Sequence, residues 1–175
     1  MRDRRGFTLV EMIIVIAIVL ILASLMVGVI NVVMSNAEYR KTEAIVKMLD
    51  DGCKTYQQEY GIYPPNDKGD SRCLHVYLGS ERVKRLDQDS GLKRKLPPII
   101  EFRTDHLDDS KTPPDAKLNP LPIIDAWGQK IQYKNPGTWN NRRVDIWSSG
   151  KNGKDELDPA GKDFDDVVNW AKIEG

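Results

Sequence analysis

Hydrophobic positions divide the chain into an apolar N-terminal stretch and a much more polar remainder. Residues 12–37 carry no charge, and the run from Met12 to Ile30 consists mainly of Ile, Val and Leu. About 20 such residues are enough for a helix to cross the hydrocarbon layer of a bilayer. Because Arg2, Arg4 and Arg5 precede the stretch, the pattern predicts a transmembrane helix whose N-terminus stays in the cytoplasm.

After Asn36 the pattern becomes that of an amphipathic helix with one apolar face. Gly61 and the Pro64–Pro65 pair predict the end of this helix, since they favour a left-handed cap and then block further helical turns. We therefore expect one helix from about residue 7 to about residue 60, with its second half covered by the rest of the chain. The apolar positions at helical spacing are Ala44, Ile45, Met48, Leu49, Cys53, Tyr56 and Tyr60.

The polar remainder predicts a small head. A short helix is expected between Leu74 and Leu86, with Leu74, Tyr77, Leu78 and Val83 turned inward, and an extended segment over 96–102. Alternating residues predict an antiparallel pair of strands at 130–134 and 143–147, with Trp127, Tyr133 and Trp147 in the core. The fold class is thus α+β, a long N-terminal helix packed against a small antiparallel sheet.

Three interpretations of the apolar stretch remain open from its length and flanks. A cleaved secretory signal normally has an apolar region of about 7–15 residues, which is shorter than this one. A plain single-pass anchor leaves Glu11 unexplained, because a carboxylate within a membrane segment costs about 2.5–3.5 kcal/mol. The third interpretation is a membrane segment in which Glu11 has a partner, since a buried charge is tolerated when it is paired.

Composition excludes several classes of protein. The 175 residues include 26 Lys and Arg against 26 Asp and Glu, whereas nucleic-acid binders usually have a basic surplus. Two Cys are too few for a disulfide scaffold. We find no phosphate loop, nucleophile elbow or zinc-protease motif, and the two His have no partners at ligand spacing. We therefore expect no enzyme and no catalytic residues.

The N-terminal segment Arg4-Arg5-Gly6-Phe7-Thr8-Leu9-Val10-Glu11 resembles the leader of type IV pilins and pseudopilins. The resemblance implies cleavage after Gly6 by a prepilin peptidase and N-methylation of the new first residue, Phe7. It also implies that Glu11 is an assembly contact that faces the N-terminal amine of a neighbouring subunit. On this basis residues 1–6 are a leader, 7–35 a membrane and filament-core helix, and 36–175 a periplasmic head.

The segment 148–170 is rich in acids and glycines, which is typical either of a solvated loop or of a site for a hard cation. It lacks the acid pattern of an EF-hand. Asp125-Ala-Trp-Gly128, Asp145-Ile-Trp-Ser-Ser-Gly150 and Asp165-Asp-Val-Val-Asn-Trp170 resemble the C-terminal signature of the major pseudopilins of type II secretion, the general secretion pathway protein G family.

That family holds a calcium ion in this loop. Carried over, the resemblance implies five ligands: the carbonyl of Ser149, the side chain of Asn152, a carbonyl near Lys154, and the carboxylates of Asp165 and Asp166. The family usually has Asp where this chain has Asn152, which lowers the charge at the site. The loop is also longer, so Asp155 or Asp158 is an alternative ligand.

The resemblance implies a structural subunit of the pseudopilus that drives folded proteins across the outer membrane. Its expected partners are other copies of itself, the prepilin peptidase, the minor pseudopilins and the inner-membrane assembly platform. The expected location is the inner membrane, single-pass, and then a periplasmic filament. Two alternatives stay open, a type IV pilus subunit and a membrane-anchored calcium-dependent binding protein that does not polymerise.

Cys53 and Cys73 would then meet an oxidising compartment and could form a disulfide. The sequence does not say whether their Cα atoms lie within bonding range. A bridge and two isolated thiols are both open.

Overall fold

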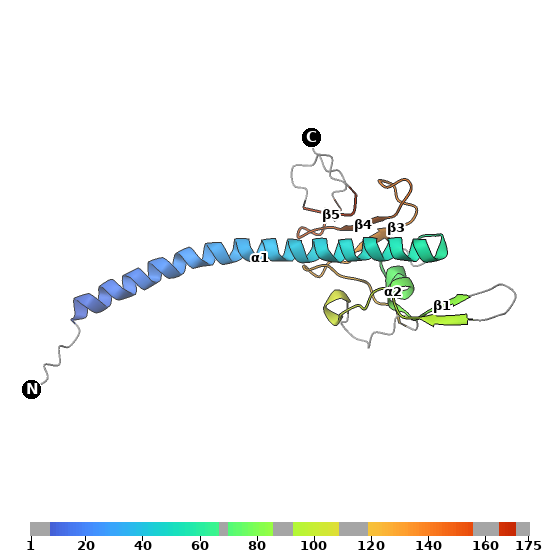
Figure 1. Cartoon of the computed structure of the whole chain (residues 1–175). Helices are drawn as coiled ribbons and strands as arrows, with labels where there is room; N and C mark the ends of the chain where they lie inside the picture. Colours follow the sequence, from blue (N-terminus) through green and yellow to red (C-terminus); the bar gives the residue numbers. More distant parts are fainter. Residues whose placement is uncertain (1–7, 67–69, 86–92, 109–118, 156–164, 171–175) are drawn as a thin grey trace, which may run out of the picture. The chain divides into compact units, whose positions relative to one another are not determined.

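The computed structural model describes residues 8–66, 70–85, 93–108, 119–155 and 165–170. The chain divides into two units, 1–38 and 39–175, each with its own internal contacts. Figure 1 labels the helices and strands.

Helix α1 runs from Leu9 to Tyr60 and belongs to both units. It ends where the sequence predicts, because Gly61 adopts a left-handed conformation with φ of +78°. The Gly61 N–H closes the last turn on the carbonyl of Gln57 at 2.8 Å. Glycine takes this conformation without the steric cost that a Cβ would bring.

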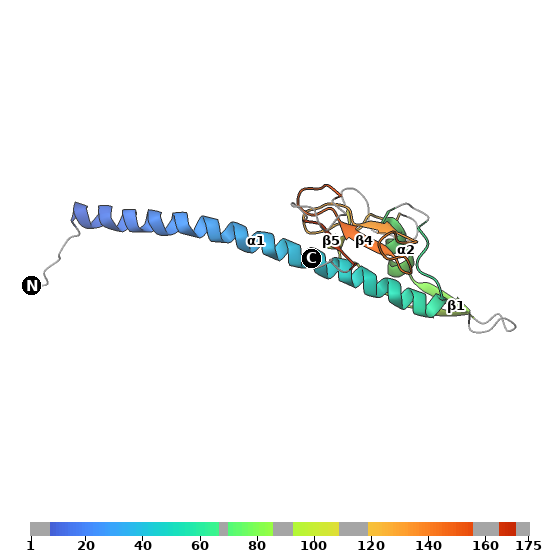
Figure 2. The same cartoon turned by 90° about the horizontal axis from the view of Figure 1, so that it is seen from above.

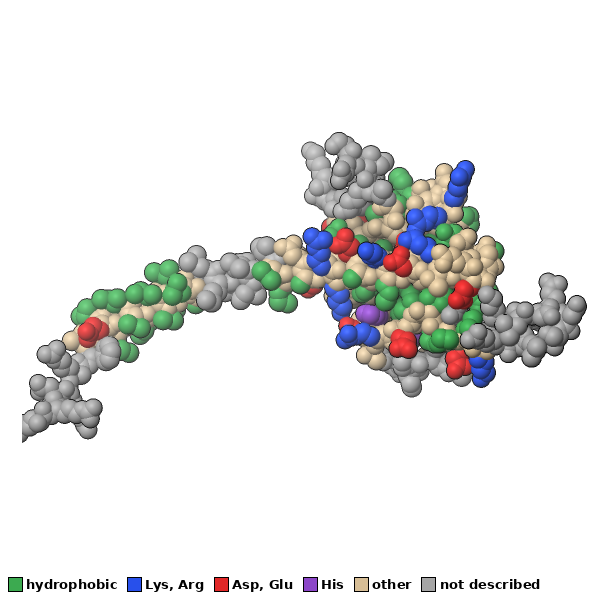
Figure 3. Space-filling model, in the orientation of Figure 1, with side chains coloured by type: hydrophobic (Ala, Val, Ile, Leu, Met, Phe, Trp, Pro, Cys, Tyr) green, Lys and Arg blue, Asp and Glu red, His purple; other side chains and the backbone are tan. Residues whose placement is uncertain are grey.

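In the first unit, the apolar side chains of α1 are exposed. From Leu9 to Leu22 the large hydrophobic residues have 49% to 74% of their surface accessible. Figure 3 shows them on the visible face of this part of the helix, close to a single acidic patch near its start. Among the residues described, no helix meets the length and hydropathy needed to cross a membrane.

In its described residues, the second unit contains one more α-helix, a short 3-10 helix and two small antiparallel sheets. Helix α2 spans Arg72–Gly79 and η1 spans Thr104–His106. Strands β1 (Arg82–Arg85) and β2 (Lys93–Leu96) form a two-stranded ribbon. Strands β3 (Gln132–Lys134), β4 (Asp145–Ser148) and β5 (Val167–Val168) form a three-stranded sheet in the order β3-β4-β5. The larger sheet and α2 both lie on one side of this part of α1 (Figure 2).

The core of the second unit is built on the apolar face predicted for α1. Ile45, Leu49 and Cys53 are at most 3% exposed and belong to one hydrophobic cluster. Leu74 and Leu78 of α2 join this cluster and are completely buried, as the sequence predicted. Burying a side chain of this size stabilises a fold by about 1.5–3 kcal/mol. The face of α1 is therefore covered by the remainder of its own chain. The cluster also includes Ile123, Ile131, Tyr133, Val144, Ile146 and Val167.

Several local predictions were wrong. The helix expected to reach Leu86 ends at Gly79, and Val83 lies in β1 instead. The ribbon β1–β2 and the edge strand β5 were not foreseen, whereas the antiparallel pairing of β3 with β4 is confirmed. Tyr133 is buried as predicted, but Trp127 and Trp147 are only partly buried.

Candidate functional sites

The start of α1 is closed by a reciprocal pair of hydrogen bonds between Thr8 and Glu11. The Thr8 N–H donates to Oε2 of Glu11 at 2.8 Å, and the Glu11 N–H donates to Oγ1 of Thr8 at 3.3 Å. The Thr8 hydroxyl also donates to Oε2 of Glu11 at 2.9 Å. This arrangement is a capping box, which satisfies two of the amides that a helix start leaves open. Within a single chain, the Glu11 carboxylate therefore already has local partners.

Thr8 was not predicted to cap the helix, although its spacing from Glu11 is the Ser/Thr-x-x-Glu signature of a capping box. Gly6 and Phe7, the residues expected at the cleavage and methylation point, lie outside the described residues.

The loop after β4 brings together four residues that were expected near a metal. The Asn152 N–H donates to Oδ2 of Asp165 at 3.0 Å, and the Lys154 N–H donates to Oδ1 of Asn152 at 2.7 Å. The hydroxyl of Ser149 donates to Oδ1 of Asp155 at 2.6 Å, so the alternative ligand Asp155 also lies in this loop. The two ends of the acid-rich segment, near 150 and near 165, are thus held side by side.

Gly150 is required at this junction. It has φ of +62°, and a Cβ placed on it would come within 2.5 Å of the carbonyl oxygen of Asp165. Any residue with a side chain would keep the two segments of the loop, near 150 and near 165, farther apart. The fixed contact places Asp165 beside the turn that begins at Ser149.

Two carboxylates of this loop are partly or fully buried. Oδ1 of Asp165 is buried and has no hydrogen-bond partner among the described residues, and Asp166 is fully buried. A buried carboxylate oxygen without a donor is costly unless a cation lies nearby. The described residues hold no group of three or more His, Cys, Asp or Glu able to bind a metal. A site here would combine two carboxylates with carbonyl and amide oxygens, a donor set that suits Ca²⁺.

Two buried aspartates organise the turns that flank the larger sheet. Asp125 is 2% exposed and accepts hydrogen bonds from the N–H groups of Trp127 and Gln129, both at 2.8 Å, and from the Ser148 hydroxyl. It therefore ties its own turn to the end of β4.

Asp145 is 1% exposed and accepts three backbone N–H groups, from Thr138, Trp139 and Asn140. These bonds fix the connection between β3 and β4. The aspartates of the sequence motifs at 125 and 145 therefore have structural roles that hydrogen bonding explains.

Asp50 forms a charged cluster between α1 and the end of the chain. Nη2 of Arg143 lies 2.8 Å and 2.9 Å from the two oxygens of Asp50, and Nζ of Lys54 lies 2.7 Å from Oδ2. Nδ2 of Asn169 donates to Oδ1 at 2.9 Å. Burial alone would raise the pKa of Asp50, but the hydrogen bonds from Lys54 and Asn169 and the charge of Arg143 outweigh it, so the pKa is lowered.

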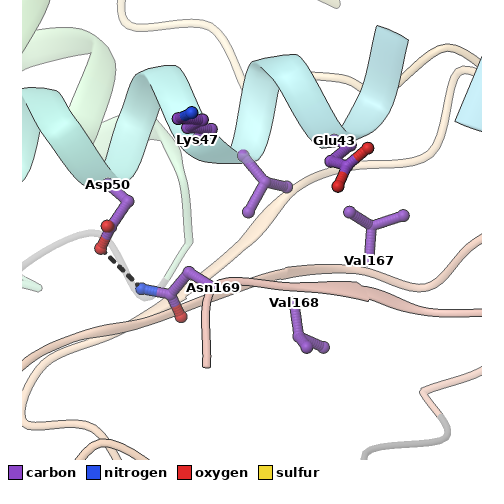
Figure 4. Close-up of a pocket in the computed structure, with 7 residues that line it drawn as sticks. Glu43, Lys47, Asp50, Val167, Val168 and Asn169 are labelled. Carbon is purple, nitrogen blue, oxygen red and sulfur yellow. Dashed lines mark hydrogen bonds between the residues drawn. The ribbon is translucent and has the colours of Figure 1, made fainter. Parts of the chain in front are cut away.

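A cavity of about 200 Å³ opens beside this cluster. Figure 4 shows Asp50 and Glu43 on α1 on the side of the strand that carries Val167 and Val168, with the Asp50–Asn169 hydrogen bond drawn. Asp50 was not predicted as a site residue, yet a signal was present, since it lies at helical spacing between the buried Val46 and Cys53. An acid on an apolar face requires partners. The lining residues are Glu43, Val46, Lys47, Asp50, Val167, Val168 and Asn169.

Cys53 and Cys73 are both free thiols in the structure, so the bridge considered from the sequence is not formed in it. Both are completely buried in the same core cluster. Burial raises the pKa of the Cys53 thiol, and the charge of Asp50 adds to the effect. Such a thiol stays protonated and unreactive.

His75 is 4% exposed, and its Nδ1 accepts the Leu121 N–H at 3.0 Å. His106 is partly buried beside Asp105.

Matches with protein families fall at the two ends of the chain that carry these features. Residues 1–27 match the model of the prokaryotic N-terminal methylation motif. Residues 110–170 match the model of type II secretion system (T2SS), protein G.

Full-length relatives agree with both matches. A type II secretion system core protein G of Pseudomonas aeruginosa is 27% identical over 170 residues, covering 97% of this chain and 96% of its own. The core protein G of Klebsiella michiganensis is 28% identical, covering 97% and 94%, and that of Vibrio cholerae is 24% identical, covering 97% and 94%. Among solved structures, the major pseudopilin of enterohaemorrhagic Escherichia coli matches with a TM-score of 0.42 and 21% identity, over 77% of this chain and 88% of its own.

Proposed function

We propose that this chain is the repeating subunit of the periplasmic pseudopilus of a type II secretion system. It is anchored in the inner membrane by the helix of residues 7–35 before assembly and is processed between Gly6 and Phe7. The fibre formed from many copies then drives folded proteins through the outer membrane. Relatives named type II secretion system core protein G align with nearly the whole chain, which supports this function.

The observation that carries the proposal is the environment of the first part of α1. Its large apolar side chains are about half exposed or more from Leu9 to Leu22, although burying them would be favourable by about 25 cal/mol for each Å². A surface of this kind needs an apolar partner. Lipid supplies that partner before assembly and the helices of neighbouring subunits supply it afterwards, so one sequence serves both states.

Glu11 has the role of an assembly contact in this proposal. It is the one charged residue among the exposed apolar residues between Leu9 and Leu22, and its cost in an apolar surrounding is offset when it has a partner. The capping box with Thr8 provides that partner in the single chain. In the fibre, the amine of Phe7 of a neighbouring subunit, freed by cleavage, provides a cationic one.

The proposal also includes a calcium ion in the loop after β4. The carbonyl oxygens of Ser149 and Lys154, the side chain of Asn152, and the carboxylates of Asp165 and Asp166 would hold it. The buried Oδ1 of Asp165, which lacks a donor among the described residues, supports this assignment. A bound cation would neutralise the adjacent carboxylates and hold the two ends of the loop together.

The test compares Glu11→Val with Glu43→Val, which makes the same change at an exposed acid on the same helix. We expect Glu11→Val to be cleaved and N-methylated at Phe7, as mass spectrometry would record, but to be at least ten-fold depleted from sheared fibres and to stop secretion. Glu43→Val should assemble and secrete normally. If both variants assemble equally, Glu11 is not the assembly contact. If the unaltered chain forms no fibre and neither change has an effect, the chain is a membrane-anchored binding protein and the fibre proposal is wrong. Loss of fibres without any secretion defect would instead favour a pilus.

A further inference from the structure

The segment 121–124 in the second unit is held on two sides by hydrogen bonds. On one side, the hydroxyl of Ser71, at the start of α2, accepts the N–H of Ile123 at 3.0 Å. On the other side, the N–H of Ile124 donates to the carbonyl of His106, at the end of η1, at 2.9 Å. Ile123 is completely buried and belongs to the core cluster. These contacts therefore keep part of the core in place.

His75 of α2 holds the same segment through a bond that requires a neutral ring. Its Nδ1 accepts the Leu121 N–H at 3.0 Å, so the proton of the neutral imidazole lies on Nε2. A protonated ring carries a proton on both nitrogens and cannot accept a hydrogen bond. Because His75 and Leu121 are only 4% and 8% exposed, protonation would leave the Leu121 N–H buried without its acceptor, which is unfavourable.

The neighbours of His75 favour the neutral ring as well. The ring of Phe102 lies edge-on to it, with 5.4 Å between the ring centroids. Arg72, the one charged residue of α2, lies 2.9 Å from Asp70, with which it forms an ion pair. An apolar ring and a carboxylate that already has a cation do not stabilise an imidazolium.

His106 favours the neutral form on the other side of the segment. Its Nδ1 is buried and has no hydrogen-bond partner among the described residues, so a proton there would be a buried donor without an acceptor. Three charged groups act on the ring, namely Asp105, Arg103 and Lys41 of α1. Asp105 is already paired with Lys41 at 3.1 Å. Burial and the two cations outweigh the attraction of Asp105, so the pKa of His106 is lowered from 6.5.

We propose that His75 and His106 form an acid-sensitive clamp, in which both rings must be neutral for the segment 121–124 to stay in place. Mild acid protonates the rings and releases the segment. They are the two histidines of the chain, and histidine is the side chain that ordinarily changes its charge between about pH 5 and 8. Release would reach α1, since the Ala126 N–H, just beyond the segment, donates to Oγ1 of Thr42 at 3.2 Å.

The direction of the pH effect follows from which state binds the protons. In the unfolded chain both rings are in water and take up protons as the pH falls below about 6.5. In the folded chain the bond from Leu121 to His75 and the buried Nδ1 of His106 oppose this uptake. The stability that the clamp contributes is therefore complete above about pH 7 and is lost as the pH falls toward about 5.

The test measures hydrogen exchange at the amides of Leu121, Ile123 and Ile124 in the full-length chain in detergent, from pH 7.5 to pH 5. After correction for the intrinsic effect of pH on exchange, the protection of these amides should fall about ten-fold or more. Protection that does not change over this range overturns the clamp. The outcome is independent of the proposed function, because every contact of the clamp lies within one chain.

A pair of variants sharpens the test. His75→Asn combined with His106→Asn should abolish most of the fall in protection, because an amide oxygen accepts a hydrogen bond and does not titrate. The control Asp50→Asn should keep the fall, since the pKa of that carboxylate is lowered from 3.8 and lies below the range measured. A fall of the same size in the double variant would show that other groups cause it and would overturn the proposal.

Nitrogen NMR of the unaltered chain gives a second readout that does not depend on a variant that folds. At pH 7.5 the Nδ1 signal of His75 should be that of an unprotonated nitrogen. On acidification its protonation should coincide with the loss of protection at Leu121. A ring that already carries a proton on Nδ1 at pH 7.5, or one that gains it while Leu121 stays protected, contradicts the clamp.

Discussion

Side chains of the same kind have opposite environments in the two units of this chain. Ile16 in the first unit is 54% exposed, and Leu49 on the same helix in the second unit is completely buried. The second unit buries its apolar face against its own chain. The first unit leaves its apolar side chains exposed. One continuous helix therefore supplies core residues at one end and an uncovered apolar surface at the other.

The largest effect should separate these two uses of an apolar residue. Leu49→Ala should lower the free energy of unfolding of the second unit by about 2–5 kcal/mol, because it removes buried contacts and leaves a cavity. Ile16→Ala should change it by no more than about 0.5 kcal/mol. Tryptophan fluorescence of the full chain in detergent, followed through denaturant, measures this, since all four Trp lie in the second unit. Equal losses for the two variants would show that the units are not independent.

Calcium removal should weaken the second unit only. At 100 times its dissociation constant a bound ion adds about 2.7 kcal/mol to the free energy of unfolding, and a chelator should remove that gain. Asp165→Asn should abolish the response to calcium, whereas Asp51→Asn, at an exposed acid of α1, should keep it. Thermal unfolding with and without chelator decides the point. An unchanged midpoint in millimolar calcium would rule out the metal site.

Asp145→Asn should lower the free energy of unfolding by about 2 kcal/mol, because hydrogen bonds to a charged acceptor are worth about 1.5–3 kcal/mol. The carboxylate accepts three N–H groups of the β3–β4 connection, and an amide can accept fewer. Hydrogen exchange at Thr138, Trp139 and Asn140 should speed up before the rest of the unit is affected. Exchange that stays slow at these amides would contradict the role given to Asp145.

The smallest effect concerns acid stability. The pKa of Asp50 is lowered from its ordinary value of 3.8, so below that value the unfolded chain binds a proton that the folded chain does not. The stability contributed by this group is complete above the ordinary value and is lost as the pH falls through the folded value.

Asp50→Asn should lower the free energy of unfolding by about 1 kcal/mol near neutral pH. The loss is small because Lys54 and Arg143 are partly exposed and can be solvated by water instead. The variant should also lose less stability than the unaltered chain as the pH falls below about 4. Unfolding of both proteins across pH 2–7 measures this. Parallel curves for Asp50→Asn and the unaltered chain would contradict it.

Much of the fold was predictable because one periodic signal extends over many residues. The apolar run, the amphipathic face and Gly61 predicted α1 with its end, and alternation predicted β3 with β4. Short elements gave weaker signals, and the charged residues of β1 and β2 do not resemble a buried strand. Their pairing depends on contacts across the chain, which propensity does not describe.

The candidate sites were predictable to different degrees. The approach of Asn152 to Asp165 followed from the family resemblance. The convergence of Lys54, Arg143 and Asn169 on Asp50 could not be foreseen, because it requires the tertiary structure. The position of Asp50 on an apolar helix face did indicate that partners were needed.

The hydrogen bond between Asp50 and Asn169 has a consequence for the order in which a copy of this chain matures. It joins residues 119 positions apart, so it forms only after synthesis has passed Asn169. A product that ends before Val167 lacks both this bond and strand β5 beside it. Synthesis through Asn169 is therefore needed before α1 can be tied to this segment.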